Sequence, residues 1–372
     1  MAKLARPVVL DARMIDHSGI GAHIRGLLQG WREADPGFRP TLLGDPERLA
    51  ERLGDGPPGA VVPFRAPIYG IREQIGFPVR RTRGALLHCP HYNIALRHAG
   101  PLVVTIHDLI HLDARWGESF RLKRLYAHWM LGQAIRRASH VFAVSNATAD
   151  ALVARFPITR ERLTVTYNAP SRAFLGAPPG PEAVERVRRE TGLAGEYLLT
   201  VGLYKAHKNL DFVIETLQSL WKDAKVDLSL VIAGVQEKER PALKRRLGAR
   251  RLEDRVRVLD RLRAEQLPLL YRGATALIHA SLLEGFGLPI VEAQAVGAPV
   301  VASRASAVPE VAGDGALYFD PEDRDDLAKQ ILAVVGNEGL RTELAEKGRR
   351  NMARFSWRRT AETVLSVYER IV

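Results

Sequence analysis

Short runs of apolar and β-branched residues alternate along the whole chain with longer stretches of mixed polarity. Strands that alternate with helices in this way predict βαβ units and parallel sheets, so the expected fold class is α/β. Two of the expected helices are 21–31 and the long basic segment 119–138. The expected strands are residues 7–13, 84–90, 101–108, 140–145, 162–168, 196–203, 226–234, 255–261, 274–281, 298–303 and 316–320.

A stretch rich in proline, glycine and alanine at 168–183 interrupts this alternation and is the expected linker. We therefore predict two doubly wound, Rossmann-like domains, residues 1–175 and 176–355, which face each other across a cleft. The remaining segment, 356–372, is expected to form a helix that packs back on the N-terminal domain. Ligands of such folds bind at the carboxyl ends of the strands, where loops lead into helix N-termini.

The composition narrows the class of protein. The 372 residues are enough for two domains, and 46% apolar and 26% charged residues are typical of a soluble globular protein. No apolar run approaches the roughly 18 to 20 residues that span a bilayer, and the N-terminus lacks the pattern of a signal peptide. The single Cys89 excludes an internal disulfide, and the sequence has no Cys/His metal cluster. We expect a cytoplasmic protein that uses no metal or other cofactor.

The charge is unevenly placed. Residues 1–180 carry 24 Lys and Arg against 14 Asp and Glu, a net +10, whereas residues 181–372 carry 30 against 28, a net +2. A basic half favours an anionic partner such as nucleic acid, acidic lipid headgroups or a phosphorylated substrate. The alternative explanation of the positive charge is a general preference for arginine as a surface residue. A nucleic-acid-binding protein stays a rival hypothesis, although the sequence has no helix-turn-helix or RNP-like motif and only 7% aromatic residues.

One short segment carries the clearest chemistry. In EGFGLPIVE, residues 284–292, two carboxylates flank a Gly-x-Gly-x-Pro bend that follows an apolar strand. The glycines permit unusual backbone conformations and close ligand approach, and the proline suits the first turn of a helix. The unpaired N–H groups of that turn would seat phosphate or sugar oxygens, and the carboxylates would accept hydrogen bonds from paired hydroxyls. We expect Glu292 in the opening turn of this helix and Glu284 in the loop before it. Glu292 could simply neutralise the helix dipole, and Glu284 could be a surface loop residue. These interpretations explain each acid singly but not the bend between them.

The segment EGFGLPIVEAQAVGAPVVAS resembles the E-x7-E motif of the retaining glycosyltransferases of family 4, which have the GT-B fold. Other segments resemble the family in the same order along nearly the whole chain. These are LLHCPHYNIAL (86–96), VVTIHDLIHL (103–112), AVSNATADAL (143–152), LTVGLYKAHKNL (199–210) and SAVPEVAGDGALYFDP (306–321).

The resemblance implies roles for the residues around the bend. The first glutamate of the family's pair, here Glu284, contacts hydroxyls of the donor sugar, and the second, Glu292, contacts the nucleotide ribose. The backbone at Gly285, Phe286, Gly287 and Leu288 would hold the sugar and the distal phosphate. Glu310 is either a nucleotide-side contact or a helix-capping acid.

Such transferases bind no metal, so cationic side chains must stabilise the negative charge that develops on the diphosphate. The loop LYKAHKN would supply them. Lys208 matches the family's phosphate-binding lysine. Many members also carry an arginine directly after the strand glycine, whereas here Leu203 follows Gly202, and Lys205 is the expected substitute. Both lysines could instead be solvated loop residues.

His107 ends a strand and matches the family's active-site histidine, which contacts the donor sugar near the reacting carbon. We assign no covalent nucleophile, because retaining enzymes of this fold show none, and a front-face mechanism with the leaving phosphate as base is the common proposal. Gly19 and Gly21 follow the first strand, and the family's equivalent loop faces the diphosphate and the acceptor. A bare G-x-G is also compatible with a simple tight turn.

The segment 68–84, IYGIREQIGFPVRRTRG, mixes apolar residues with Arg80, Arg81 and Arg83. This mixture suits contact with anionic headgroups and a lipid-diphosphate acceptor, and an ordinary amphipathic helix suits it equally. For 119–138 the amphipathic helix is the better interpretation.

The resulting hypothesis is a cytoplasmic, membrane-associating, retaining and metal-independent hexosyltransferase. It would transfer mannose from GDP-mannose to a lipid-linked or saccharide acceptor in polysaccharide or glycolipid biosynthesis. A UDP-sugar-dependent transferase and a nucleotide-sugar epimerase of the same fold are the alternatives.

Overall fold

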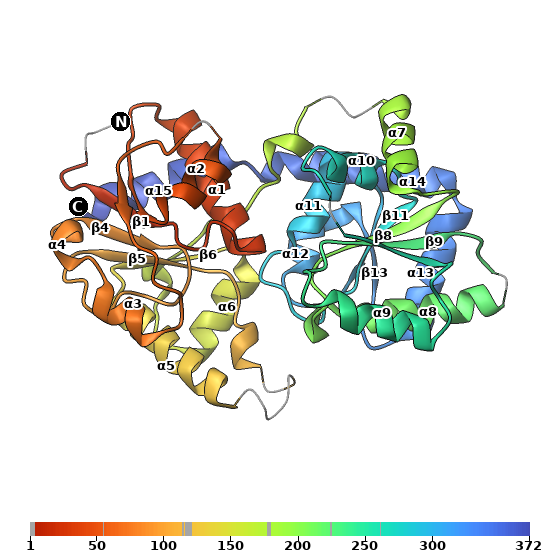
Figure 1. Ribbon diagram of the computed structural model, residues 1–372, viewed down its shortest axis with the longest axis horizontal. Helices are drawn as coiled ribbons and strands as arrows, with labels where there is room; N and C mark the ends of the chain where they lie inside the picture. Colours follow the sequence, from red (N-terminus) through yellow and green to blue (C-terminus); the bar gives the residue numbers. More distant parts are fainter. Residues whose placement is uncertain are drawn as a thin grey trace. The chain divides into compact units, whose positions relative to one another are not determined.

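The computed structural model describes residues 4–54, 56–113, 115, 121–176, 180–223, 225–260 and 262–372. The chain forms two compact units (Figure 1). Unit 1 contains the chain up to Ala169 together with Phe355–Val372, and unit 2 is Pro170–Arg354. The sequence placed the boundary after residue 175, inside the expected linker. Residues 177–179 of that linker and 119–120 of the expected basic helix lie outside the described residues.

Unit 1 contains a seven-stranded parallel sheet with the order β3-β2-β1-β4-β5-β6-β7. The sequence pattern predicted every strand except β2 and β3, which are only four and three residues long. The strands are β1 (Val8–Asp11), β2 (Thr41–Gly44), β3 (Val61–Pro63), β4 (Leu86–Cys89), β5 (Leu102–Ile106), β6 (His140–Ala143) and β7 (Leu163–Val165).

Unit 2 contains a six-stranded parallel sheet with the order β10-β9-β8-β11-β12-β13. All six strands were expected from the apolar runs. They are β8 (Tyr197–Val201), β9 (Ser229–Ala233), β10 (Val256–Leu259), β11 (Ala276–His279), β12 (Val300–Ser303) and β13 (Leu317–Phe319).

The strand order reverses once in each sheet, between β1 and β4 in unit 1 and between β8 and β11 in unit 2. Such a reversal is the topological switch point of a doubly wound fold, where ligands bind beyond the carboxyl ends of the strands. The predicted α/β class with two Rossmann-like parallel sheets is therefore confirmed.

Helices cover the sheet of unit 1 on both faces. They are α1 (Ser18–Ala34), α2 (Pro46–Leu53), α3 (Ile71–Gly76), α4 (Val79–Thr82), α5 (Arg121–Arg137), α6 (Asn146–Arg155) and α15 (Trp357–Ile371). Buried side chains of α5 pack with Val104 and Ile106 in one apolar cluster. Those of α1 and α15 pack with Val103 and Phe142 in another.

The C-terminal helix α15 packs against α1 (Figure 1). Glycines make this close approach possible, because a Cβ atom on Gly26 would lie 2.0 Å from the ring of Trp357. A Cβ atom on Gly30 would lie 2.1 Å from the carbonyl oxygen of the same tryptophan. The last helix of the chain is thus part of unit 1.

Helices cover the sheet of unit 2, and four of them contribute buried side chains to one large apolar cluster with the strands. The helices of unit 2 are α7 (Pro181–Thr191), α8 (Leu210–Lys222), α9 (Arg240–Ala249), α10 (Gln266–Gly273), α11 (Leu288–Ala295), α12 (Val308–Ala312), α13 (Arg324–Gly336) and α14 (Glu338–Asn351). α13 ends at Gly336, and Phe355 lies between α14 and α15. In the described part of the chain, no helix has the length and apolar character needed to cross a membrane.

Candidate functional site

Two loops of unit 2 meet at its topological switch point, one after β8 and one after β11. Lys208 Nζ, from the first loop, contacts Oε1 of Glu284, from the second. Ser281 Oγ donates a hydrogen bond to the same oxygen at 2.8 Å. His279 Nε2 lies 3.3 Å from it, without the alignment of a good hydrogen bond. Lys208 and Glu284, both predicted from sequence, are therefore in direct contact at an edge where ligands bind.

The Glu284 carboxylate is ionised in this arrangement. Burial alone would raise its pKa, but the positive charge of Lys208 and the adjacent His279 outweigh burial and lower the pKa well below its usual range. The side chain is nearly buried, with 10% of its surface exposed. An anionic acceptor in such a place is suited to bind hydroxyl donors.

The local backbone fixes Lys208. It ends a short 3-10 turn, Ala206–Lys208, and Asn209 then adopts a left-handed conformation with φ of 56° before α8 begins. The side-chain amide of Asn209 donates to the carbonyl oxygen of Pro321 at 2.9 Å. The backbone N–H of Leu282 donates to the carbonyl oxygen of His207 at 2.7 Å, which ties the loop after β11 to the loop after β8.

A small pocket lies between these loops and is lined by Gly202, Lys208, His279 and Ser281, among others. Its lining brings a cation, an imidazole and a hydroxyl together with a glycine that leaves the main chain accessible. These are groups that hold an anion or a polyol.

The bend predicted to hold phosphate and sugar leads into α11. Gly287 precedes Leu288, the first helical residue, with a φ of 95° that glycine tolerates and most residues do not. Gly285 and the buried Phe286 lie in the loop before it. Ser306 Oγ donates to the backbone carbonyl of Glu284 at 2.7 Å and so holds this loop from the other side.

Glu292 differs from Glu284 in position and in charge. It is the fifth residue of α11 and not, as the sequence suggested, part of the opening turn. Tyr271 OH donates to its Oε2 at 2.9 Å. Burial raises the pKa of Glu292 to about 7, and the hydrogen bond from Tyr271 opposes that rise. The side chain keeps part of its surface exposed. It therefore titrates near neutral pH, whereas Glu284 stays ionised.

Lys205 has a carboxylate partner of its own. Its Nζ lies 3.0 Å from Oε1 of Glu239, which is buried. Oε2 of Glu239 accepts a hydrogen bond from the backbone N–H of Tyr204 at 2.9 Å. The side chain of Lys205 is 45% exposed, so its remaining N–H donors could reach a diphosphate while Glu239 offsets part of its charge.

In unit 1, His107 directly follows β5, as predicted. Its Nε2 lies 2.9 Å from the carbonyl oxygen of Pro90, an arrangement in which the ring donates from Nε2 and leaves Nδ1 as an acceptor. Burial and the nearby His23 hold the pKa of His107 well below its usual range. The ring is therefore neutral, and its predicted contact with a donor sugar would be that of a neutral group.

Gly19 and Gly21 lie in the first turn of α1 and not in a loop before it. A Cβ atom on Gly21 would lie 2.3 Å from the carbonyl oxygen of Ile15, so packing requires this glycine. Gly19 is exposed and has no atom within 4 Å of that position, so packing does not require it. Glu310 lies in the first turn of α12, where an acid also stabilises a helix.

Sequence reasoning missed the partners that set the charge states of the site. His279 and Ser281 lie in the apolar run 274–281, which was interpreted only as a strand, and Tyr271 lies in a segment before it that carried no prediction. Glu239 precedes α9, in a segment that carried no recognisable motif. Only the three-dimensional contacts identify these residues.

Family models match both halves of the chain. The model described as Glycosyltransferase Family 4 matches residues 17–170. The model described as Glycosyl transferases group 1 matches residues 184–351, which contain Lys208 and both glutamates. The chain belongs to the family 4 glycosyltransferases.

Curated relatives of this glycosyltransferase include O-antigen chain mannosyltransferase B from Escherichia coli, 27% identical over 78% of the chain and 76% of the relative. O-antigen chain mannosyltransferase RfbU from Salmonella typhimurium is 28% identical over 61% of the chain. The match spans 60% of the length of RfbU.

A solved structure of HepE from Anabaena, in complex with UDP and glucose, is similar in fold. The TM-score is 0.76 at 21% identity, over 97% of this chain and 99% of that one. This glycosyltransferase therefore has the GT-B fold.

Proposed function

We propose that this glycosyltransferase binds a nucleotide-diphosphate sugar at the switch point of unit 2 and transfers its hexose with retention of configuration. The observation that carries the proposal is the Lys208–Glu284 contact beside the start of α11. One group suits diphosphate, the other suits sugar hydroxyls, and the positive end of the α11 dipole lies at the same loop.

The groups of this site would promote transfer by stabilising charge. As the bond between sugar and phosphate breaks, negative charge builds on the leaving diphosphate, and Lys208 together with the positive end of the α11 dipole would stabilise it. Glu284 would orient the hexose through its hydroxyls. The leaving phosphate would take the proton of the acceptor hydroxyl, so no side chain of this chain is assigned as nucleophile.

We propose GDP-mannose as the donor, because the mannosyltransferases of Escherichia coli and Salmonella typhimurium named above are similar to this chain. A UDP-sugar is the alternative, supported by the similar fold of HepE with UDP and glucose. The acceptor would be a lipid-linked or free saccharide in polysaccharide or glycolipid assembly on the cytoplasmic side of a membrane.

The test is a transfer assay with GDP-mannose and UDP-glucose, with and without a saccharide acceptor. We expect a product whose new glycosidic bond keeps the anomeric configuration of the donor, as measured by NMR. The same rate is expected after treatment with EDTA. An inverted product would contradict the retaining mechanism, and loss of activity restored by a divalent cation would contradict metal independence.

A nucleotide-sugar epimerase of the same fold predicts a different outcome. It would convert or hydrolyse the donor at the same rate whether or not an acceptor is present. Consumption that depends on the acceptor supports the transferase, and acceptor-independent epimerisation supports the alternative.

A further inference from the structure

Exposed large apolar side chains are concentrated in two segments of unit 1, which meet where Tyr69 contacts Tyr126. Nine large apolar side chains are exposed in the described part of the chain, and six of them belong to two segments, one leading into α3 and one at the start of α5. Their exposed fractions range from 47% to 83%. We call this set the α3/α5 surface; its members are Tyr69, Ile71, Ile75, Leu122, Leu125 and Trp129.

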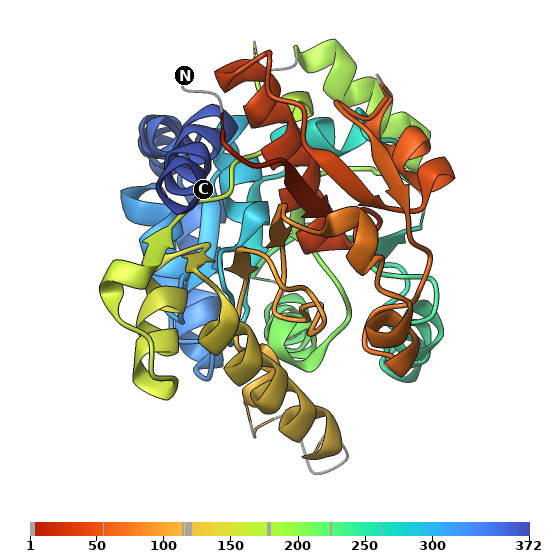
Figure 2. The same ribbon diagram turned by 90° about the vertical axis from the view of Figure 1, so that its left-hand side faces the viewer.

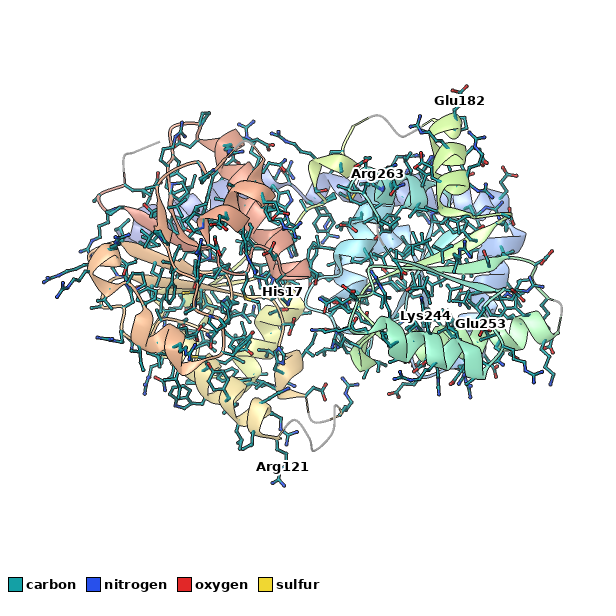
Figure 3. The ribbon with its side chains drawn as sticks, viewed as in Figure 1. His17, Arg121, Glu182, Lys244, Glu253 and Arg263 are labelled. Carbon is teal, nitrogen blue, oxygen red and sulfur yellow. The ribbon has the colours of Figure 1, made fainter. Side chains whose placement is uncertain are left out.

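Helix α5 is apolar on two faces. Its inner face packs in the core through Ala127, Met130, Leu131, Ala134 and Ile135, as expected of an amphipathic helix. A second apolar stripe, Leu122, Leu125 and Trp129, has the i, i+3, i+7 spacing of one helical face and points outward. Figure 2 shows α5 extending from the body of unit 1, and Figure 3 places Arg121 at its outer end. The amphipathic interpretation of 119–138 therefore explains only its inner side.

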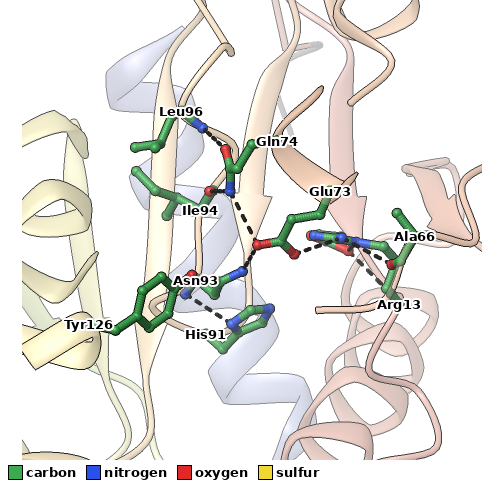
Figure 4. A network of polar contacts seen from close by, with 10 residues as sticks. Arg13, Ala66, Glu73, Gln74, His91, Asn93, Ile94, Leu96 and Tyr126 are labelled. Atoms are coloured by element: carbon green, nitrogen blue, oxygen red, sulfur yellow. Dashed lines mark hydrogen bonds and ion pairs between the residues drawn. The ribbon is translucent and has the colours of Figure 1, made fainter. Parts of the chain in front are cut away.

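The exposed charge of the two segments that carry these apolar side chains has one sign, although Asp108, which belongs to neither segment, lies near Tyr69. Residues 69–100 and 121–139 contain ten Lys and Arg and a single acid, Glu73. Glu73 is buried and faces inward, where it pairs with Arg13 at 3.1 Å and accepts a hydrogen bond from Asn93 (Figure 4). No acidic side chain of these two segments is therefore exposed beside the α3/α5 surface.

Aromatic rings connect this surface with the carboxyl edge of the sheet. The ring centroid of Tyr126 lies 6.3 Å from Trp129 and 6.3 Å from Tyr69. Tyr69 in turn lies 6.1 Å from Tyr92 and 6.4 Å from His91, which follow β4. Tyr126 OH donates to Asn93, which fixes α5 against the same network (Figure 4). The surface and the strand ends thus form one continuous part of unit 1.

We propose that the α3/α5 surface docks on a bilayer that contains anionic lipids. The apolar side chains would enter the boundary between headgroups and acyl chains, and the surrounding arginines would contact lipid phosphates. The aromatic connection would then bring the carboxyl edge of the sheet close to a lipid-linked acceptor. That last link rests on the proposed function, whereas docking itself does not.

Charge complementarity favours a bilayer over a second copy of this chain. A symmetric contact would place the ten basic residues opposite the same ten residues of the partner, and like charges facing each other oppose association. An anionic bilayer instead presents a continuous layer of negatively charged headgroups to these basic side chains.

The experiment is flotation of the full chain with vesicles of phosphatidylcholine alone and of phosphatidylcholine mixed with phosphatidylglycerol. One variant is Ile71→Gln/Leu122→Gln/Leu125→Gln. Its matched control, Val153→Gln/Leu175→Gln/Leu332→Gln, replaces three exposed apolar residues outside the surface. We expect wild type and control to float with the anionic vesicles, and the α3/α5 variant to bind at least about tenfold more weakly.

A second pair of variants tests the charge. Arg80→Gln/Arg81→Gln/Arg121→Gln is expected to weaken binding by about fivefold per residue near the lipid, and Arg186→Gln/Arg189→Gln/Arg245→Gln in unit 2 is expected to leave it unchanged. Added salt should weaken binding of the wild type. Circular dichroism and thermal unfolding would verify that each variant is folded.

Three outcomes would overturn the proposal. They are a wild type that floats with neither vesicle, an α3/α5 variant that binds as the wild type does, and a wild-type dimer that the α3/α5 variant converts to monomer in sedimentation. Nucleotide binding is measured separately and uses residues of unit 2, so failure of docking is distinguishable from failure of the proposed function.

Discussion

Lys208 and Glu284 are 76 residues apart in the sequence and in contact in the structure. Each reaches the same point because β8 and β11 are neighbours in the sheet and both end there. The contact satisfies two charges that would otherwise lie unpaired in a largely buried place. A donor would enter by offering phosphate to Lys208 and hydroxyls to Glu284.

Replacement of Lys208 by methionine should weaken donor binding. The variant loses a charge-assisted interaction with diphosphate, and we expect about 10- to 100-fold lower affinity for a nucleoside diphosphate. Isothermal titration calorimetry measures this directly. Lys244→Met, on the exposed face of α9, is the control and should bind as the wild type does. Equal affinities for both variants would remove Lys208 from the site.

Replacement of Glu284 by glutamine should separate catalysis from nucleotide binding. The amide keeps the shape but loses the negative charge that accepts sugar hydroxyls, so kcat should fall by about 100-fold or more. Affinity for the nucleoside diphosphate alone should change little, and the thermal unfolding profile should still be that of a folded protein. Glu346→Gln, an exposed substitution in α14, should be silent. Transfer at the wild-type rate in Glu284→Gln would refute the assignment.

Donor affinity should depend on pH through Glu292. Its pKa of about 7 means that the carboxyl is protonated below neutral pH, while ribose hydroxyls need the ionised form as acceptor. Affinity should therefore rise with pH, by up to about tenfold per unit below pH 7, and level off above it. Glu292→Gln should remove this dependence, as read from calorimetric titrations at several pH values. Tyr271→Phe should shift the midpoint upward, since Tyr271 lowers that pKa. A flat pH profile in the wild type would exclude this role.

The two glycines at the start of α1 should respond differently to the same substitution. Gly21→Ala forces a methyl group against the carbonyl oxygen of Ile15, and we expect it to lower the free energy of unfolding by about 1–3 kcal/mol. Gly19→Ala meets no neighbour and should leave stability unchanged, while turnover falls if a ligand approaches the backbone there. Urea denaturation and a transfer assay on both variants measure the two effects. Wild-type turnover in Gly19→Ala would remove Gly19 from the donor site.

The fold followed from the sequence because each buried parallel strand is a nearly unbroken apolar run. VVTI in β5 and LVIA in β9 are such runs, and little else competes with a strand there. β2 and β3 escaped notice because the apolar runs inside them, LL in TLLG and VV in VVP, are only two residues long and adjoin glycine or proline. The start of the helix at Leu288 was predicted correctly, but Glu292 is its fifth residue and so lies just past the opening turn in which it was expected.

The site was only half visible in the sequence. The motif around Glu284 pointed to the bend proposed to bind the donor, but no spacing rule predicts that Ser281 and Lys208 share one oxygen of Glu284. The outward stripe of α5 was missed for a related reason. A sequence pattern with apolar residues on two faces of a helix does not show which face is buried. The exposure of Leu125 and Trp129 is therefore seen only in the structure.

The central claim is that the loops after β8 and β11 hold a nucleotide-diphosphate sugar. Its most direct test is calorimetric titration of the wild type, Lys208→Met and Glu292→Gln with GDP-mannose and UDP-glucose. We predict that one of the two donors binds the wild type and that both variants weaken its binding. Absence of binding by either donor, or binding that neither substitution changes, would contradict the claim.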